Sequence, residues 1–164
     1  MGVLAFVVGF VAFFSGLLPV VPHDDVPVDA ADAATQTVER AQDARAMLAA
    51  LNAERAENGR AALSLDARLC DIARSHARDM VRRQYFSHVD PDGVDPFGRM
   101  RRSHYPFGFA GENIALDAGV DAADRALFAS LEHRANILQP HFNRVGIAAV
   151  SATGGEVFVE DFSD

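Results

Sequence analysis

The chain has 164 residues and a mass of 17.7 kDa, which suits one domain of ordinary size with an appendage. Apolar residues make up 49% and charged residues 23%, so the chain is neither intrinsically disordered nor collagen-like. The formal net charge of −8 argues against a nucleic-acid-binding surface, and we expect no nucleic-acid partner. Cys70 is the only cysteine, which excludes intrachain disulfides and cysteine-based zinc fingers.

Residues 1–21 predict a transmembrane anchor. Val3 to Val21 contains no formally charged side chain, and as a helix it would span about 28 Å, close to the roughly 30 Å of a bilayer core. The run lacks the polar stripe that a buried globular helix would show. A cleaved signal peptide is the rival interpretation, although no basic residue precedes the run and Leu18-Pro19-Val20-Val21-Pro22 is a poor cleavage site. We therefore expect a membrane protein with its domain outside the cytoplasm, or a secreted protein if the segment is cleaved.

Residues 22–34 predict a linker, because two prolines and four aspartates favour an extended chain. The remaining residues, 35–164, predict one globular domain. Its first helix is expected to start near Thr37 and to end at Asn58-Gly59, a suitable left-handed stop. Asp66 is a good N-cap for a second helix, whose apolar residues recur at helical spacing.

The second half of the domain changes from helices to strands. Three short helices are expected, from Pro96 to about Ser103, from Asp121 to about Leu131, and around Arg134–Leu138. Val145–Val150 and Glu156–Glu160 flank Thr153-Gly154-Gly155, a pattern typical of an antiparallel hairpin. Early helices and late strands indicate an α+β fold, with helices packed on a small antiparallel sheet.

Three polar residues are candidates for chemistry. His88 and His133 each adjoin an expected element end, where side chains can project into a cleft. Glu112 lies between them in an apolar segment, where a buried carboxylate would need basic or hydrogen-bonding partners. The separations of these residues match no local metal motif. His76, on the apolar face of the second helix, is better interpreted as a core histidine than as a ligand.

Several stretches of the sequence together resemble the CAP superfamily, which is named for cysteine-rich secretory proteins, antigen 5 and plant pathogenesis-related proteins. The similarity is closest to its small prokaryotic branch of SCP-like extracellular proteins. The stretches, in chain order, are Leu51-Asn52-Ala53-Glu54-Arg55, Tyr85-Phe86-Ser87-His88, Gly111-Glu112-Asn113-Ile114-Ala115, His133-Arg134-Ala135-Asn136-Ile137-Leu138, Phe142-Asn143-Arg144-Val145-Gly146-Ile147 and Glu160-Asp161-Phe162.

The resemblance implies an α-β-α sandwich with a central antiparallel sheet, and a cleft lined by histidines and acidic residues. Residue by residue, it assigns His88, Glu112 and His133 to that cleft and associates them with a divalent metal, chiefly zinc. Larger members add a second glutamate from the helix before the last histidine. Here residues 126–130 contain no carboxylate, and Glu132 stands where relatives usually have glycine. The three-residue set is therefore the better supported one.

Chemistry allows three uses for this set. Two neutral imidazoles and a carboxylate can form an open zinc site, a metal-free acid/base set, or a hydrogen-bonded cluster that fixes loops. No serine can be singled out as a nucleophile, and Cys70 is better interpreted as a packed side chain. The leading hypothesis is therefore a membrane-tethered binding or scaffolding module for a small ligand, lipid or envelope component, able to hold Zn²⁺ or another divalent cation. The alternative is a metal-dependent, peptidase-like hydrolase, for which His88, Glu112 and His133 would be the catalytic candidates.

Overall fold

A computed structural model describes residues 30–164. The predicted anchor, residues 1–21, and most of the predicted linker therefore lie outside the described residues. Within residues 30–164, no helix combines the length and apolar character needed to cross a bilayer.

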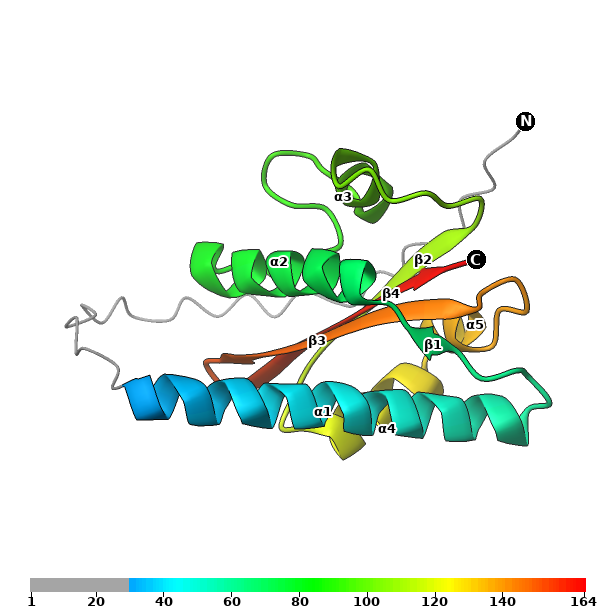
Figure 1. Cartoon of the computed structure of the whole chain (residues 1–164), viewed down its shortest axis with the longest axis horizontal. Coiled ribbons are helices and arrows are strands. Elements are labelled where there is room, and N and C mark those ends of the chain that lie inside the picture. The colour runs from blue at the N-terminus through cyan, green and yellow to red at the C-terminus, as the bar shows by residue number, and fades with distance from the viewer. Residues whose placement is uncertain (1–29) are drawn as a thin grey trace.

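The described chain forms five helices and four strands (Figure 1). The helices are α1 (Ala30–Glu57), α2 (Ala67–Arg83), α3 (Pro96–Arg102), α4 (Val120–Ala129) and α5 (Leu131–Ile137). The strands are β1 (Ser64–Leu65), β2 (Ala110–Asp117), β3 (Arg144–Ala152) and β4 (Gly155–Ser163). Every helix and the hairpin predicted from the sequence are present, and β1 and β2 are additional strands.

Helix boundaries follow local capping chemistry. Asp66 caps α2 as expected, because its side chain accepts hydrogen bonds from the backbone amides of Arg68 and Leu69. Helix α1 starts at Ala30, seven residues before the predicted Thr37, so residues 30–34 are helical rather than extended. Helix α4 begins at Val120, one residue before the expected Asp121. Gly119 is its N-cap, and Asp121 lies in the first turn, where a carboxylate interacts favourably with the helix dipole.

The sheet is mixed, which corrects the antiparallel sheet expected from the sequence. Its strand order is β1-β3-β4-β2, with antiparallel pairing of β3 with β4 and of β4 with β2. Strand β1 runs parallel to β3, pairing Ser64 with Arg144 and Leu65 with Val145. This short pairing escapes sequence reasoning because two residues carry no periodicity. Strand β2 is left as an edge of the sheet.

Helices cover both faces of the sheet (Figure 1). Helices α2 and α3 lie on one face, and α1, α4 and α5 lie on the other. Alternate residues of β2, β3 and β4 enter two separate cores. Ile114, Val157 and Val159 pack against α2, whereas Ala115 and Phe158 pack in the core with α1 and α4.

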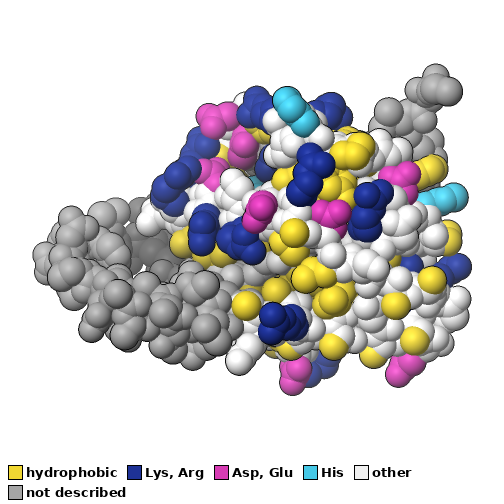
Figure 2. All heavy atoms as spheres, viewed as in Figure 1, with side chains coloured by type: hydrophobic (Ala, Val, Ile, Leu, Met, Phe, Trp, Pro, Cys, Tyr) yellow, Lys and Arg dark blue, Asp and Glu magenta, His cyan; other side chains and the backbone are white. Residues whose placement is uncertain are grey.

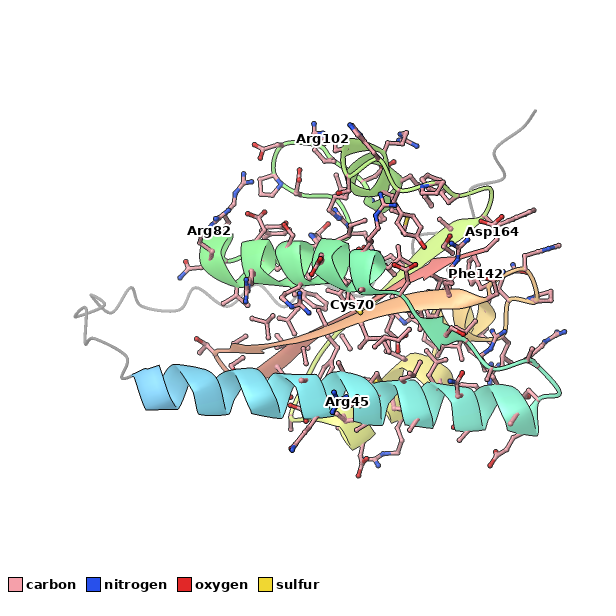
Figure 3. The ribbon with its side chains drawn as sticks, viewed as in Figure 1. Arg45, Cys70, Arg82, Arg102, Phe142 and Asp164 are labelled. Carbon is pink, nitrogen blue, oxygen red and sulfur yellow. The ribbon has the colours of Figure 1, made fainter. Side chains whose placement is uncertain are left out.

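Helix α2 approaches β3 so closely that only glycine fits at position 146. A Cβ atom there would lie 2.1 Å from the backbone carbon of Leu69 and 2.4 Å from the backbone nitrogen of Cys70. At the same crossing, the backbone amide of Ile147 donates to the Cys70 sulfur at 3.4 Å. Figure 3 places Cys70 on α2, between this helix and the sheet. As expected, Cys70 is a packed side chain.

A buried arginine ties α1 to the loop after α5. The Arg55 side chain is 1% exposed and donates to four backbone carbonyls, those of Ala61, Ile137, Gln139 and Phe142. A buried guanidinium needs acceptors for its N–H groups, and irregular loops offer unpaired carbonyls. Arg55 therefore fixes the segment that follows α5 and, with it, the position of that helix.

Candidate functional site

The site is centred on paired residues of β2 and β4. Glu112 lies opposite Asp161, and Asn113 lies opposite Glu160. Because side chains alternate along a strand, Glu112 and Asp161 share the face that packs against α2 and α3. We call this pair and its contacts the charged face. Asn113 and Glu160 project to the side of α1, α4 and α5, and we call that side the amide face.

Glu112 is a fully engaged carboxylate, with a side chain that is 1% exposed. Its Oε1 lies 2.8 Å from His88 Nδ1, and its Oε2 accepts from Arg99 Nη2 at 2.6 Å. His76 Nε2 lies 3.9 Å from Oε2. Burial raises the pKa of Glu112, but the His88 hydrogen bond and the Arg99 charge outweigh it, so that the net pKa is lowered. Glu112 is therefore ionised at neutral pH.

Arg99 positions the loop as well as the carboxylate. Its Nη1 donates to the carbonyl oxygens of His88 at 2.9 Å and Val94 at 3.1 Å, while Nη2 holds Glu112. Asp95, the N-cap residue of α3, accepts a hydrogen bond from the backbone amide of Gly98 at 2.6 Å. One guanidinium from α3 thus fixes both partners of the His88–Glu112 contact.

Asp161 supplies the second carboxyl group of the charged face. Its side chain is buried, and neither carboxyl oxygen accepts a hydrogen bond from the described residues. Burial, followed by the neighbouring charge of Glu112, holds the pKa of Asp161 well above its ordinary range. The charged face therefore pairs a carboxyl group whose pKa is lowered, Glu112, with one whose pKa is raised, Asp161.

The amide face is a chain of hydrogen bonds that joins β2 to α5. Asn113 Nδ2 donates to Glu160 Oε2 at 3.0 Å and to the carbonyl oxygen of His133 at 3.3 Å. Asn136 Nδ2 donates to Asn113 Oδ1 at 3.0 Å and to the carbonyl oxygen of Glu112 at 3.2 Å. Burial raises the pKa of Glu160 to about 7. Asn113 and Asn136 thus each donate to a backbone carbonyl as well as to a side chain, which is a structural role.

The sequence-predicted residues come from three segments around the β2 edge of the sheet. His88 and Glu112 are in direct contact at 2.8 Å. His133 belongs to α5 in the opposite layer and is 4% exposed, and its Nε2 is buried without a hydrogen-bond partner. Burial and then the charge of His88 lower the pKa of His133, which keeps its imidazole neutral. All three residues are buried.

Sequence reasoning missed Arg99 and Asp161, and it assigned His76 only to packing. His76 is buried as expected, but it also lies beside Glu112. Asp161 lies between Glu160 and Phe162 near the end of β4, and the strand alternation that puts it on the same face as Val157 and Val159 was a usable signal. Arg99 had no comparable signal, because three arginines of α3 look alike in the sequence.

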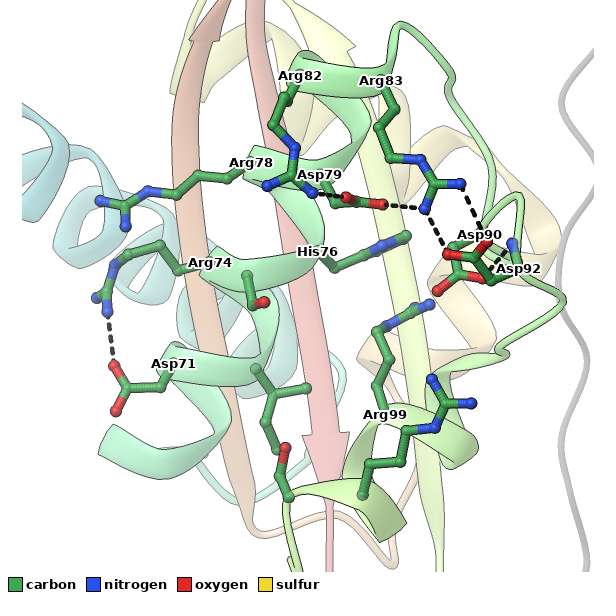
Figure 4. A pocket seen from close by; sticks show the side chains of 14 residues that line it. Asp71, Arg74, His76, Arg78, Asp79, Arg82, Arg83, Asp90, Asp92 and Arg99 are labelled. Atoms are coloured by element: carbon green, nitrogen blue, oxygen red, sulfur yellow. Dashed lines mark hydrogen bonds and ion pairs between the residues drawn. The ribbon is translucent and has the colours of Figure 1, made fainter.

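A groove opens beside the charged face, between α2, α3 and the loop that joins them (Figure 4). Its lining includes His76 and Arg99, which also contact or approach Glu112. Solvent therefore approaches the cluster from this side.

A three-layer α+β domain with a histidine–glutamate contact against an edge strand defines the class of this protein. Residues 48–162 match the family model for CAP, the cysteine-rich secretory protein family. The chain therefore belongs to the CAP family. The Bacillus subtilis (strain 168) protein YkwD is 34% identical over 112 residues, covering 68% of this chain and 43% of YkwD. The B. subtilis membrane protein YlbC is 34% identical over 98 residues, covering 58% of this chain and 28% of YlbC. This chain thus spans less than half the length of either relative.

Solved structures of bacterial surface and extracellular proteins share the fold. An extracellular protein with an SCP domain from Bacillus anthracis superposes with a TM-score of 0.68 at 26% identity, covering 76% of this chain and 41% of that one. An outer surface protein of Borrelia burgdorferi gives a TM-score of 0.70 at 18% identity, covering 75% of this chain and 92% of that one. The relatives and structural neighbours named here are thus described as extracellular, outer surface or membrane proteins.

Proposed function

We propose that this protein is a membrane-tethered, extracytoplasmic binding module. Relatives described as extracellular, outer surface or membrane proteins support the location. The uncharged run Val3–Val21 supports the tether, with a secreted form as the outcome if the run is cleaved. Protease added to intact cells should then remove the domain, whereas full protection of the domain would contradict the proposed topology.

The engagement of Glu112 favours binding over catalysis. Both of its carboxylate oxygens already have partners, and His88, Glu112 and His133 are each 4–5% exposed. A general base must reach the proton that it removes, and a carboxylate held by Arg99 on one side and His88 on the other is poorly placed to do so. Cys70 is equally unsuited to attack a substrate, because burial raises the pKa of its thiol.

A divalent metal remains part of the proposal. Two neutral imidazoles and a carboxylate are suitable zinc donors, and the partnerless Nε2 of His133 is consistent with such a role. In the arrangement described for residues 30–164, however, no three histidine, cysteine or acidic side chains are grouped to hold a metal ion. Arg99 competes for Glu112, so we expect modest zinc affinity that falls as pH drops through the histidine range. His88, Glu112 and His133 would hold a bound ion, and the ion would act as a Lewis acid.

One comparison separates a binding module from a metal-dependent hydrolase. The zinc-loaded full-length protein and its Glu112→Gln variant are incubated with a broad peptide library, and turnover is followed by mass spectrometry. We expect no turnover by either protein. Turnover that disappears in Glu112→Gln would replace the binding module with a peptidase. Calorimetric zinc titration of the wild type, His88→Ala and His133→Ala tests the ligand set, and equal binding by all three would remove the metal from the proposal.

A further inference from the structure

His76 on α2 presents its two ring nitrogens to different neighbours. Its Nδ1 lies 3.4 Å from the Tyr85 hydroxyl oxygen, and that hydroxyl donates to Asp79 Oδ2 at 2.9 Å. A phenol has one proton to donate, so the Tyr85 oxygen can only accept a hydrogen bond from His76. These hydrogen bonds assign the imidazole proton to Nδ1, which leaves a lone pair on Nε2 in the neutral ring.

The neutral form of the ring is the one that this position favours. The His76 side chain is 1% exposed, so an imidazolium there would be a buried charge. Glu112, the acid that Nε2 approaches, already has a cationic partner in Arg99 at 2.6 Å. His76 therefore does not have to supply the positive charge that Glu112 needs.

The Nε2 atom of His76 faces the Glu112 carboxylate without a hydrogen bond. Nε2 and Oε2 are 3.9 Å apart, and Nε2 is buried and has no hydrogen-bond partner among the described residues. With the proton on Nδ1, both facing atoms carry lone pairs. Zinc binds imidazole nitrogen and carboxylate oxygen at about 2.0–2.2 Å, so one ion can contact both atoms at this separation.

Asp161 offers further oxygen ligands on the same face. It lies opposite Glu112 in the pairing of β2 with β4, its side chain is buried, and its two carboxyl oxygens have no hydrogen-bond partner among the described residues. Buried polar atoms normally have partners, and an imidazole with two carboxyl groups is a donor set suited to a divalent cation. Because no three such side chains are grouped within residues 30–164, Asp161 has to turn to complete the set.

The groove beside the charged face gives an ion access to this position. It has a volume of about 610 Å³, and its lining extends from exposed residues such as Asp71 and Arg74 to the buried His76. Figure 4 shows the side chains of His76 and Arg99 directed into the same region from α2 and α3. A carboxylate oxygen has two lone pairs, so Arg99 and an ion can both contact Oε2, although the guanidinium charge weakens cation binding.

We propose that His76 and Glu112 together hold the divalent cation, and that Asp161 completes this set on the charged face. The inference deepens the proposed function and rests on it, because it names side chains that hold the cation. The set differs from His88, Glu112 and His133 in taking its imidazole from α2. His88 then fixes the other carboxylate oxygen of Glu112, Oε1, at 2.8 Å.

Calorimetric titration of the full-length protein with zinc chloride tests the inference. His76→Asn keeps a polar group near the position of Nδ1, beside Tyr85, and removes Nε2. We expect its zinc affinity to fall about tenfold or more, and that of Asp161→Asn to fall as well. Unchanged affinity in His76→Asn, with a loss in His88→Ala or His133→Ala, would overturn this inference and keep the proposed metal set. Absence of zinc binding by the wild type would overturn both.

A surface histidine provides the matched control. Figure 2 shows histidine side chains at the surface of the molecule, where an exposed imidazole can also bind zinc. His141 is exposed, stacks on Phe109 with ring centroids 4.4 Å apart, and lies outside the groove lining. His141→Asn should keep the zinc affinity of the wild type to within about twofold. An equal loss in His76→Asn and His141→Asn would overturn the site on the charged face.

Nitrogen NMR of the wild-type imidazoles tests the inference even if His76→Asn does not fold. In the metal-free protein at neutral pH, His76 should carry its proton on Nδ1 and none on Nε2. Saturating zinc should shift the Nε2 resonance and leave Nδ1 protonated. A proton on Nε2 before zinc is added, or an Nε2 resonance that zinc does not shift, would overturn the inference.

Discussion

The two faces of the β2–β4 pair bury the same kind of acid and treat it in opposite ways. On the charged face, Arg99 and His88 keep Glu112 ionised. On the amide face, Glu160 accepts from the uncharged Asn113, and burial raises its pKa to about 7. Both side chains are almost completely buried. Burial alone therefore does not fix the charge of an acid in this fold; the nearest donor does.

Removal of Arg99 should give the largest effect on this comparison. Arg99→Ala leaves Glu112 as a buried charge without its guanidinium partner, which typically costs about 3–5 kcal/mol. Urea unfolding at pH 7 measures this loss. The double variant Arg99→Ala/Glu112→Gln should recover part of the stability, because the uncompensated charge is gone.

Arg101→Ala is the matched control on the same helix. The Arg101 side chain is 62% exposed and lies 3.7 Å from Asp95, so its removal should change stability by no more than about 0.5 kcal/mol. A similar cost for Arg99→Ala and Arg101→Ala would show that the charged face does not depend on its cation.

Neutralising Glu160 should stabilise the amide face at alkaline pH. The folded pKa of Glu160, about 7, exceeds its unfolded value near 4.5, so the wild type is favoured below about pH 4.5 and loses stability as pH rises through 7. Glu160→Gln lacks this loss. Its free energy of unfolding should match the wild type near pH 4 and exceed it by about 3 kcal/mol at pH 8.

Urea titrations at both pH values measure this gain, with Glu132→Gln on the exposed surface of α5 as the control. A Glu160→Gln difference that does not change between pH 4 and pH 8 would mean that Glu160 is not protonated in the folded protein at neutral pH.

Breaking the amide chain should have a smaller effect. Asn136→Ala leaves Asn113 Oδ1 and the Glu112 carbonyl without their donor, at a cost of about 1–3 kcal/mol. Hydrogen exchange should also quicken in α5, because this helix loses a tie to β2. Asn143→Ala, at an exposed position, is the control, and equal exchange in both variants would argue against this role.

The smallest effect is expected at the groove rim. Asp71 pairs with Arg74 at 2.6 Å, but these side chains are 74% and 44% exposed. Asp71→Asn should therefore change the free energy of unfolding by no more than about 0.5 kcal/mol, and by less at high salt. A cost comparable to that of Asn136→Ala would mean that rim pairs contribute to stability as buried contacts do.

Sequence patterns predicted the helices and strands better than the pairing and packing between them. Cap chemistry placed α2 and α3, and a glycine turn placed the β3–β4 hairpin, because these signals are local. The parallel pairing of β1 escaped prediction, since it depends on where the chain after α1 passes β3. The early start of α1 shows that alanines prevailed over the aspartates and prolines around them.

For the candidate site, too, the sequence predicted some residues and missed others. The resemblance placed His88 and Glu112 together, and they are in contact. Arg99 could not be distinguished from its neighbours in the sequence, because only the turn of α3 decides which arginine faces Glu112. The arrangement of Glu112 on the charged face and of α5 on the amide face depends on strand alternation at an edge, which requires the register of β2 to be known.

The attachment of α5 to β2 has a consequence for the side chains at its two ends. Asn113 holds residue 133 through its main-chain carbonyl, and Asn136 reaches the main chain of residue 112. Because both acceptors are main-chain carbonyls, neither hydrogen bond depends on which side chain stands at position 133 or 112. A change of the His133 side chain therefore leaves both ties between α5 and β2 in place, whereas a change of Glu112 also removes the partner of Arg99 and His88. The attachment of α5 thus constrains the main chain at position 133 and not the chemistry of its side chain.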